Sequence, residues 1–342
     1  MSRPTIIDLA TAAGVSLATV DRVLNSRPGV RQVTVEKVNS AVERIGFVRD
    51  PFAANLARKR DFKVIAFVPK GDGQFLTEIC NSVRKTAHAL AAERVDLVLQ
   101  QFEGDDAHTL AVLLDMTNSD AVDGVVIMAL ETPPLRDSVR RLRARGVSVV
   151  AIISDLPNSG TDYFIGINNL AAGRTAGALM GRMLPQGPAK VAVMTSSLQA
   201  WDSLDRRLGF DQSIAEGFGN INVLATVEGH DDPATLDTAL RRVLAAHPDL
   251  GGVYSMGGGN RVLLALLRQA GLTGKVRVIA HELTQTTRAG LRQDQIDAVI
   301  TQDLGHIMRS AIRTLRAIRD QRPILAEQER IRIEILVKDN LD

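Results

Sequence analysis

The chain has 342 residues, of which 45% are hydrophobic and 23% charged, a balance typical of a soluble globular protein with more than one domain. Residues 1–60 carry 10 Lys/Arg against 5 Asp/Glu, whereas the remainder carries 31 against 34, so only the N-terminal part suits a polyanion. The lone Cys80 excludes an intramolecular disulfide. With no signal-peptide pattern and no run of roughly 20 apolar residues, we expect a cytoplasmic protein without a membrane span.

Residues 5–25 predict two short helices around a tight turn. Thr5 and Asp8 have the spacing of a capping box, Gly14 permits the positive φ that ends the first helix, and Ser16 caps the second. The predicted buried faces are Ile6, Leu9, Ala10 and Ala13, then Val20, Val23 and Leu24. The side chains left outside the second helix are Leu17, Ala18, Asp21, Arg22 and Asn25. Such a pair of helices places the second helix in a DNA groove.

A third helix and a short linker complete the N-terminal part. The third helix has a buried stripe of Val35, Val38, Val42 and Ile45 and ends at Gly46. These three helices form a predicted headpiece over residues 1–49. Asp50 and Pro51 then open a short hinge helix within residues 50–61, which is marginal alone and forms only when docked.

The remaining chain, residues 62–342, alternates Val- and Ile-rich runs with amphipathic stretches, which indicates buried parallel sheets. Strands are predicted near 64–69, 95–101, 124–130, 148–154, 163–168, 190–196, 222–228, 251–256, 277–282, 298–302 and 331–336. Helices are predicted over 74–92, 106–118, 134–145, 170–184, 203–217, 234–246, 260–271 and 304–320. We expect two doubly wound lobes, residues 62–162 with 297–324 and residues 163–296 with 325–342, whose strand ends face one cleft.

With these parts in place, the chain resembles the LacI (lac repressor) family of bacterial transcription regulators over its full length. The residues that carry the resemblance are 5–25, 52–59, 166–169, 172–174, Arg206 with Gly209 and Phe210, and 278–282. The body also resembles the type I periplasmic sugar-binding proteins. The resemblance implies a small all-α helix-turn-helix headpiece with a hinge helix, followed by a two-lobed α/β body with doubly wound parallel sheets. It also implies a cofactor-free homodimer on double-stranded, pseudo-palindromic operator DNA, and the absence of an added heptad segment favours dimers over tetramers.

By this resemblance, the start of the second helix reads base edges in the major groove. The guanidinium of Arg22 can contact guanine O6 and N7 in a fork, whereas Leu17 and Ala18 offer apolar contact, for instance to a thymine methyl. Leu56 matches the hinge leucine that wedges into the minor groove and kinks the duplex. The further DNA-binding candidates are Thr5, Ser16, Thr19, Asn25, Arg31, Thr34, Asn55 and Lys59. The resemblance does not assign a role to Asp21. The alternative for the three-helix unit is a headpiece that contacts only proteins. The alternative for Leu56 is a side chain that packs on the body.

The resemblance also implies a small-molecule effector in the cleft, a sugar, polyol or sugar acid. Arg206, four residues before Phe210, matches the family arginine that donates to the effector, and Glu282 stands where aspartate is usual. The other candidates are Gln74, Phe75, Asp155, Asn168, Trp201, Gly258, Asn260 and Gln302. The alternatives are core packing for Phe75 and Trp201, turn capping for Asp155, solvation for Arg206, and a flexible turn whose helix is capped by Asn260.

Three other readings compete with a sugar-responsive repressor. Within the family, a purine or another metabolite is the alternative effector, with a co-repressor or activator role. A sugar-processing enzyme with an attached headpiece is disfavoured because the six histidines are scattered and no metal-binding or nucleophile motif is present. A purely architectural DNA-binding protein leaves the large body unexplained. We therefore expect no catalytic residues and no metal site.

Overall fold

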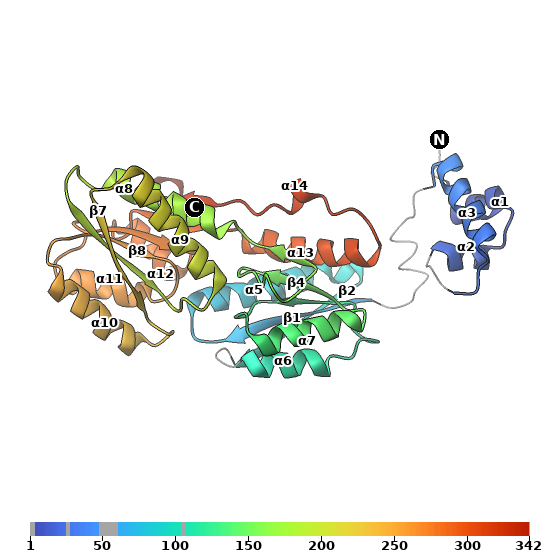
Figure 1. Cartoon of the computed structure of the whole chain (residues 1–342), viewed down its shortest axis with the longest axis horizontal. Helices are drawn as coiled ribbons and strands as arrows, with labels where there is room; N and C mark the ends of the chain where they lie inside the picture. The colour runs from blue at the N-terminus through green and yellow to red at the C-terminus, as the bar shows by residue number, and fades with distance from the viewer. Residues whose placement is uncertain (1–3, 25–27, 48–60, 104–106, 342) are drawn as a thin grey trace. The chain divides into compact units, whose positions relative to one another are not determined.

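The structure is a computed structural model that describes residues 4–24, 28–47, 61–103 and 107–341 (Figure 1). The chain divides into two compact units, residues 1–61 and 62–342, which we call the headpiece and the body. In the described part of the chain, no helix is long and apolar enough to cross a membrane. Four of the predicted DNA-binding residues, Asn25, Asn55, Leu56 and Lys59, lie outside the described residues, as does the predicted hinge helix.

Within its described residues, the headpiece holds three helices, α1 (Ile6–Ala13), α2 (Leu17–Leu24) and α3 (Gln32–Ile45). The predicted capping box is present, since the Thr5 amide donates to Asp8 Oδ2 at 2.8 Å and the Asp8 amide donates to Thr5 Oγ1 at 3.3 Å. Gly14 ends α1 with φ 65°. Ser16 caps α2, because its hydroxyl accepts from the Thr19 amide at 3.2 Å. Local side-chain hydrogen bonds thus fix the turn between the two helices.

A small apolar core joins the three helices. Its fully buried members are Leu9, Ala10, Val20, Val38 and Ala41, and Val23, Leu24, Val42 and Ile45 pack against them. The prediction that Ile6 shares this core is wrong: its side chain is 39% exposed, because it lies in the first turn of α1, before the helix reaches the core. Gly46 ends α3 as predicted.

The first lobe of the body is built on a five-stranded parallel sheet of order β2-β1-β3-β4-β5. Its strands are β1 (Phe62–Lys70), β2 (Val95–Glu103), β3 (Gly124–Ile127), β4 (Ser148–Ile152) and β5 (Tyr163–Ile165). Its helices are α5 (Gln74–Leu90), α6 (Ala107–Met116), α7 (Pro133–Ala144) and α13 (Leu304–Arg319), with a short turn η1 (Ala91–Glu93) after α5. Apolar side chains of α5 and α13 cover one face of the sheet and those of α6 and α7 the other, so the lobe is doubly wound.

The second lobe is built on a six-stranded sheet of order β11-β10-β9-β8-β6-β7. Its strands are β6 (Ala189–Thr195), β7 (Ile221–Glu228), β8 (Leu250–Ser255), β9 (Arg277–His281), β10 (Ala298–Thr301) and β11 (Glu334–Leu336). Its helices are α8 (Asn169–Met183), α9 (Trp201–Gly217), α10 (Pro233–Ala246), α11 (Asn260–Gln269) and α12 (Gln285–Arg292). The short α14 (Ala326–Glu329) and η2 (Lys338–Asn340) flank β11, the one antiparallel strand among those described.

The sheet pairing corrects the expected lobe boundaries at two strands. Residues 163–165 pair with β4 in the first lobe, although we expected residues from 163 onward in the second. Residues 298–301 pair with β9 in the second lobe, although we expected residues 297–324 in the first. Both strands are short, and burial alone does not tell which sheet a strand extends. The chain therefore returns from the second lobe to the first only after β10, through Gln302.

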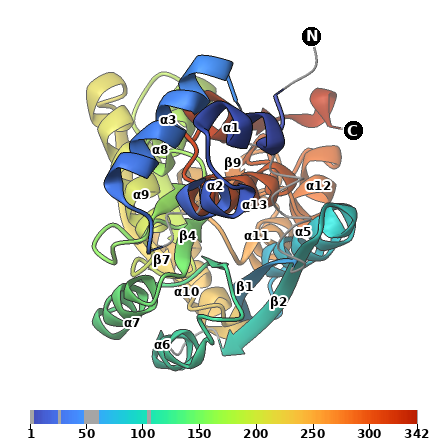
Figure 2. The same cartoon turned by 90° about the vertical axis from the view of Figure 1, so that its right-hand side faces the viewer.

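Helices α8 and α9 pack with their backbones in contact, and they lie together in both views of the molecule (Figures 1 and 2). A Cβ atom on Gly173 would lie 2.0 Å from the carbonyl oxygen of Arg206. A Cβ atom on Gly209 would lie 2.0 Å from the carbonyl oxygen of Leu170. These two glycines permit the close approach that sets the position of Arg206.

The body begins at a residue that α13 holds firmly. Phe62 is 2% exposed, and the guanidinium groups of Arg319 and Arg316 lie 4.9 Å and 5.9 Å from the centre of its ring. Arg316 also donates from Nη1 to Glu93 Oε2 at 2.8 Å. The next amide, of Lys63, donates to Asp123 Oδ2 at 2.8 Å. The first residue of the body is thus held by the last turns of α13, and the next residue by Asp123, just before β3.

Candidate functional site

One candidate site is the exposed face of α2 in the headpiece. Leu17, Ala18 and Arg22 are exposed there, as predicted for side chains that read bases. Arg31 is also exposed and precedes α3 without capping it. Ser16, Thr19 and Thr5 have their hydroxyls in the caps described above, so any contact that they make with phosphate shares a local hydrogen bond. Thr34, in the first turn of α3, is half-buried.

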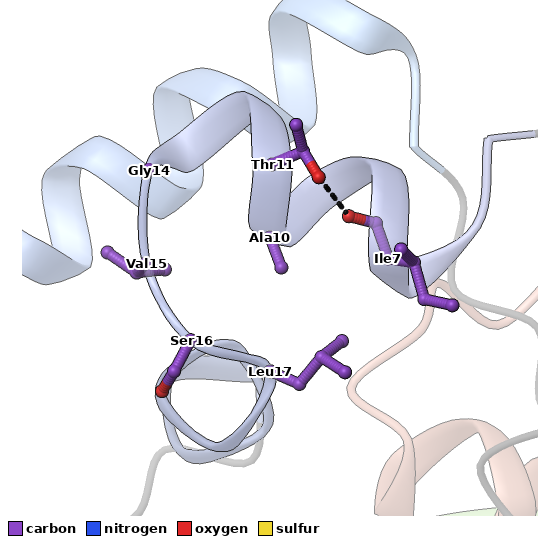
Figure 3. Close-up of a pocket in the computed structure, with 7 residues that line it drawn as sticks. All are labelled: Ile7, Ala10, Thr11, Gly14, Val15, Ser16 and Leu17. Atoms are coloured by element: carbon purple, nitrogen blue, oxygen red, sulfur yellow. Dashed lines mark hydrogen bonds between the residues drawn. The ribbon is translucent and has the colours of Figure 1, made fainter.

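One residue beside this face, Ile7, was not predicted from the sequence. Ile7 is 62% exposed and lines, with Leu17, a pocket between the end of α1 and the start of α2 (Figure 3). The other lining residues are Ala10, Thr11, Gly14, Val15 and Ser16. The signal was available, because Ile7 lies off the apolar face of α1 and a large apolar side chain there has no core to enter. Ile7 extends the apolar part of the exposed surface next to Leu17.

The second candidate site centres on Arg206, which lies in α9 and is only 2% exposed. Its Nε donates to Asn169 Oδ1 at 2.9 Å and its Nη1 to the carbonyl oxygen of Met256 at 2.7 Å. Its Nη2 donates to Glu282 Oε1 at 3.3 Å. The solvated helix arginine considered above is therefore excluded. Arg206 links the start of α8, the end of β8 and the end of β9.

Glu282 and Gln302 follow two neighbouring strands and complete this cluster. Gln302 Nε2 donates to the same Oε1 of Glu282 at 2.9 Å. Burial raises the pKa of Glu282, and Arg206 and Gln302 oppose that rise. Glu282 has φ 67°, and the β-branched Ile153, after β4, has φ 69°. Such left-handed conformations are unfavourable for these residues and concentrate at functional sites.

His281 and Glu282 do not form an acid–base pair. His281 Nε2 lies 2.8 Å from the hydroxyl of Tyr254, whose ring stacks on Phe210 with centroids 4.6 Å apart. Burial lowers the pKa of His281 well below its usual range, and Arg206 adds to this shift, so the imidazole is neutral. Tyr254 and His281 are buried near enough to Arg206 for its charge to act on both.

Three aspartates lie close to one another: Asp155 follows β4, and Asp202 and Asp205 lie in the first turns of α9. Asp202 Oδ2 is 3.7 Å from Arg206 Nη1, one helical turn away on α9. Burial raises the pKa of Asp205, and the charges of Asp202 and Asp155 raise it further. Asp155 also accepts from the Leu156 amide at 2.7 Å, which supports the predicted turn-capping alternative for this residue. Arg206 therefore faces two carboxylates, those of Glu282 and Asp202.

Hydrogen bonds join the two lobes beside the cluster. Gln74, at the start of α5 in the first lobe, accepts at Oε1 from the Thr286 amide at 3.0 Å in α12 of the second lobe. Trp201, the first residue of α9, donates its indole N–H to a carboxylate oxygen of Glu131 in the first lobe. The Asp202 amide donates to Ser154 Oγ at 3.4 Å. Gln74 and Trp201 thus lie where the lobes meet.

The remaining predicted effector-binding residues differ in exposure and in the contacts that they make. Asn168 is exposed and caps α8, accepting from the Ala171 amide at 2.9 Å, and its neighbour Asn169 is the residue that holds Arg206. Phe75 packs partly buried against the core, as its alternative predicted. Gly258 lies in the loop after β8 with φ 71°. Capping of α11 by Asn260 is wrong, because Gly259 occupies the cap and the helix begins at Asn260.

Comparison with known proteins identifies both units. A model of the bacterial regulatory proteins of the lacI family matches residues 5–50. A model of the periplasmic binding protein domain matches residues 65–322. The chain belongs to the LacI family. Its body has the type I periplasmic-binding-protein-like fold that the resemblance implied.

Curated relatives of this LacI-family chain are transcription regulators. It is 29% identical over 164 residues to catabolite control protein A of Priestia megaterium. This match covers 46% of this chain and 48% of that protein. It is 25% identical over 240 residues to the transcriptional repressor PurR of Haemophilus influenzae strain PittEE, which covers 70% of this chain and 68% of that protein. The first of these matches spans about half the length of the relative.

Solved structures of sugar-binding proteins share the fold of the body. An ABC transporter solute-binding protein from Burkholderia graminis, in complex with D-arabinose, is 26% identical with a TM-score of 0.72, over 82% of this chain and 96% of that one. The glucose-galactose-binding protein GanP of Geobacillus stearothermophilus is 20% identical with a TM-score of 0.73, over 83% and 99%. The second likeness establishes the fold alone.

Two residues of the cluster around Arg206, Asn169 and Asp202, were not predicted from the sequence of this LacI-family chain. Asp202 had a signal, since a carboxylate four residues before an arginine on a helix pairs with it. Asn169 was part of the motif that carried the resemblance, but Asn168 was chosen for the site. Among the residues described by the structure, no group of three or more His, Cys, Asp or Glu side chains could hold a metal ion.

Proposed function

We propose that this protein is a ligand-responsive transcription regulator, a repressor that acts as a homodimer on a pseudo-palindromic operator. One observation carries the proposal: a helix-turn-helix with Arg22 exposed on its second helix shares a chain with a two-lobed body that buries a polar cluster at its strand ends. The repressor named among the relatives and the arabinose in the Burkholderia structure support it. The effector is a sugar or polyol, and the protein binds it without turnover.

Binding and response are coupled through the two lobes. The hydrogen bonds of Gln74 and Trp201 hold the lobes together beside the cluster, and a ligand that favours this arrangement over an open one shifts the population between them. The ligand's differential affinity for the two arrangements sets the change in DNA affinity. The segment around Leu56 transmits this change by wedging into the minor groove.

The DNA-reading role of α2 is tested by Arg22→Ala. With an operator selected from a random DNA pool, we expect Arg22→Ala to lose about 1 to 3 kcal/mol of operator binding, about 5- to 150-fold, and to lose little on random DNA. Arg31→Ala is the matched control, because a phosphate contact contributes alike on both DNAs. Fluorescence anisotropy measures both. An equal loss on operator and random DNA for Arg22→Ala contradicts base reading by this residue.

The coupling between ligand and operator is tested by titration. A panel of sugars and polyols is first screened for thermal stabilisation of the full chain, since a ligand that binds only the folded state raises its melting temperature. Operator binding is then measured with and without each stabilising compound at saturation. We expect the operator Kd to change by about 5- to 150-fold. Superimposed curves with a saturating ligand would contradict regulation by that ligand.

A further inference from the structure

The hydrogen-bonding state of Arg206 restricts the charge of the ligand. Of the five N–H groups of a guanidinium, three already donate to Asn169, Met256 and Glu282. The side chain is 3% exposed, and Asp202 faces its Nη1 at 3.7 Å. A ligand carboxylate or phosphate needs several free donors in a fork, and it needs a cation that is not already neutralised. Arg206 keeps two N–H groups, but Glu282 at 3.3 Å and Asp202 at 3.7 Å already neutralise its charge.

The acceptors of the cluster, in contrast, have capacity left. Both donors to Glu282 reach Oε1, so Oε2 has no partner among the residues described. Gln302 must turn its Nε2 toward that carboxylate, because a carboxylate only accepts, and this orientation fixes its amide. Its Oε1 is then a buried acceptor without a partner within the described chain, on a residue only 4% exposed. Ligand hydroxyl groups are the complementary donors.

The aspartates near the cluster also disfavour a negatively charged ligand. Asp155, Asp202 and Asp205 lie near enough to one another to influence the pKa of Asp205, which burial and its two neighbours raise. The neighbouring arginines are held by other carboxylates: Arg207 donates to Asp211 at 2.8 Å, and Arg136 pairs with Glu131 at 3.0 Å. An anion entering this region meets like charges in a partly desolvated site, where their repulsion is strong.

From this geometry, and resting on the function proposed above, we propose that the site binds hydroxyl-rich ligands without negative charge and rejects their carboxylate and phosphate counterparts. Neutral sugars and polyols donate to Glu282 and Gln302 without disturbing the Arg206–Glu282 pair. Amino sugars satisfy the same acceptors and add a cation opposite the aspartates. Sugar acids, which the sequence left open as effectors, are excluded by this charge arrangement.

The first experiment compares matched probes on the full chain by thermal shift and calorimetry. The probes are D-glucose, D-galactose and D-arabinose, their aldonates, their phosphates, and D-glucosamine and D-galactosamine. For each sugar that binds, we expect the aldonate and the phosphate to have a Kd weaker by about tenfold or more. An aldonate or phosphate that binds more tightly than its neutral parent overturns the proposal. If no neutral or amino sugar binds, the function proposed above is contradicted for this panel.

A second experiment tests the charge argument without a known ligand. Glu282→Gln removes the buried partner of Arg206, so inorganic phosphate should raise the melting temperature of this variant relative to chloride at equal ionic strength, and leave that of the wild type unchanged. Glu216→Gln is the matched control, because it removes the partner of Arg174 on the surface, with 2.6 Å between Arg174 Nη2 and Glu216 Oε2. Stabilisation of the wild type by phosphate to the same extent as Glu282→Gln overturns the proposal. If Glu282→Gln does not fold, Asp202→Asn serves the same comparison.

Discussion

Gly209→Ala is expected to cost the body at least about 3 kcal/mol of unfolding free energy, near or beyond the upper end for overpacked cores. The added methyl group would lie 2.0 Å from the carbonyl oxygen of Leu170, a backbone atom that cannot move without separating α8 from α9. Because Arg206 lies one turn earlier on α9, its contacts with Asn169 and Glu282 should be lost as well. Urea denaturation followed by circular dichroism measures the effect.

Gly217→Ala is the matched control, since it makes the same substitution in the same helix. Nothing lies within 4 Å of the position of its added methyl group. Alanine is also favoured over glycine in a helix, so we expect this variant to match the wild type or gain up to about 1 kcal/mol. Equal stability of Gly209→Ala and Gly217→Ala would show that the close contact between α8 and α9 does not constrain the fold.

Arg206→Met is expected to lower the unfolding free energy by about 3 to 5 kcal/mol, because it leaves the buried carboxylate of Glu282 without its cation. The double variant Arg206→Met/Glu282→Gln should recover most of this loss, since it removes the unpaired charge and keeps an acceptor for Gln302. Arg207→Met is the control on the adjacent residue. Its pair with Asp211 is partly exposed, so we expect a loss of about 1 kcal/mol or less.

The pH dependence of Arg206→Met follows from the raised pKa of Glu282. Without Arg206, which opposes that rise, the carboxyl group binds a proton in the folded state at a pH where the unfolded state has lost it. The folded state then holds more protons, so the unfolding free energy decreases as pH rises from 5.5 to 8 (about the window above the usual carboxyl pKa). Denaturation at both ends of this window measures the slope relative to the wild type. A slope equal to that of the wild type would contradict the assignment to Glu282.

Most elements of the body were predictable because buried strands and half-buried helices leave a regular pattern of apolar residues in the sequence. The Val- and Ile-rich strands and the amphipathic helices lie within a few residues of their predicted bounds. Helix α12 was missed because its buried face contains Thr287, Gly290 and Leu291, which give little apolar periodicity. The sheet membership of β5 and β10 was predicted wrongly because it depends on pairing with residues far along the chain, which a local pattern does not contain.

The candidate site was predictable in its charged members and not in its hydrogen bonds. Arg206, Glu282 and Gln302 come from one helix and two strand ends that only the resemblance placed together, and the structure brings them into contact. Asn168 was predicted for the site, but the side chain of Asn169 is the one that contacts Arg206. Adjacent residues at the start of a helix point in different directions, and the sequence alone does not show which of the two points inward. The three hydrogen bonds from Arg206 to protein acceptors could not be predicted from the sequence either.

Helix α13 connects the cluster around Arg206 mechanically to Phe62, the first residue of the body. The helix begins two residues after Gln302, which contacts Glu282, and its final turns clasp Phe62, where the body begins. Its 16 residues span about 24 Å at the usual rise per residue, so a tilt of about 5° at the site moves the far end by about 2 Å. A small rotation at the cluster around Arg206 would therefore be magnified at Phe62, where the chain enters the body.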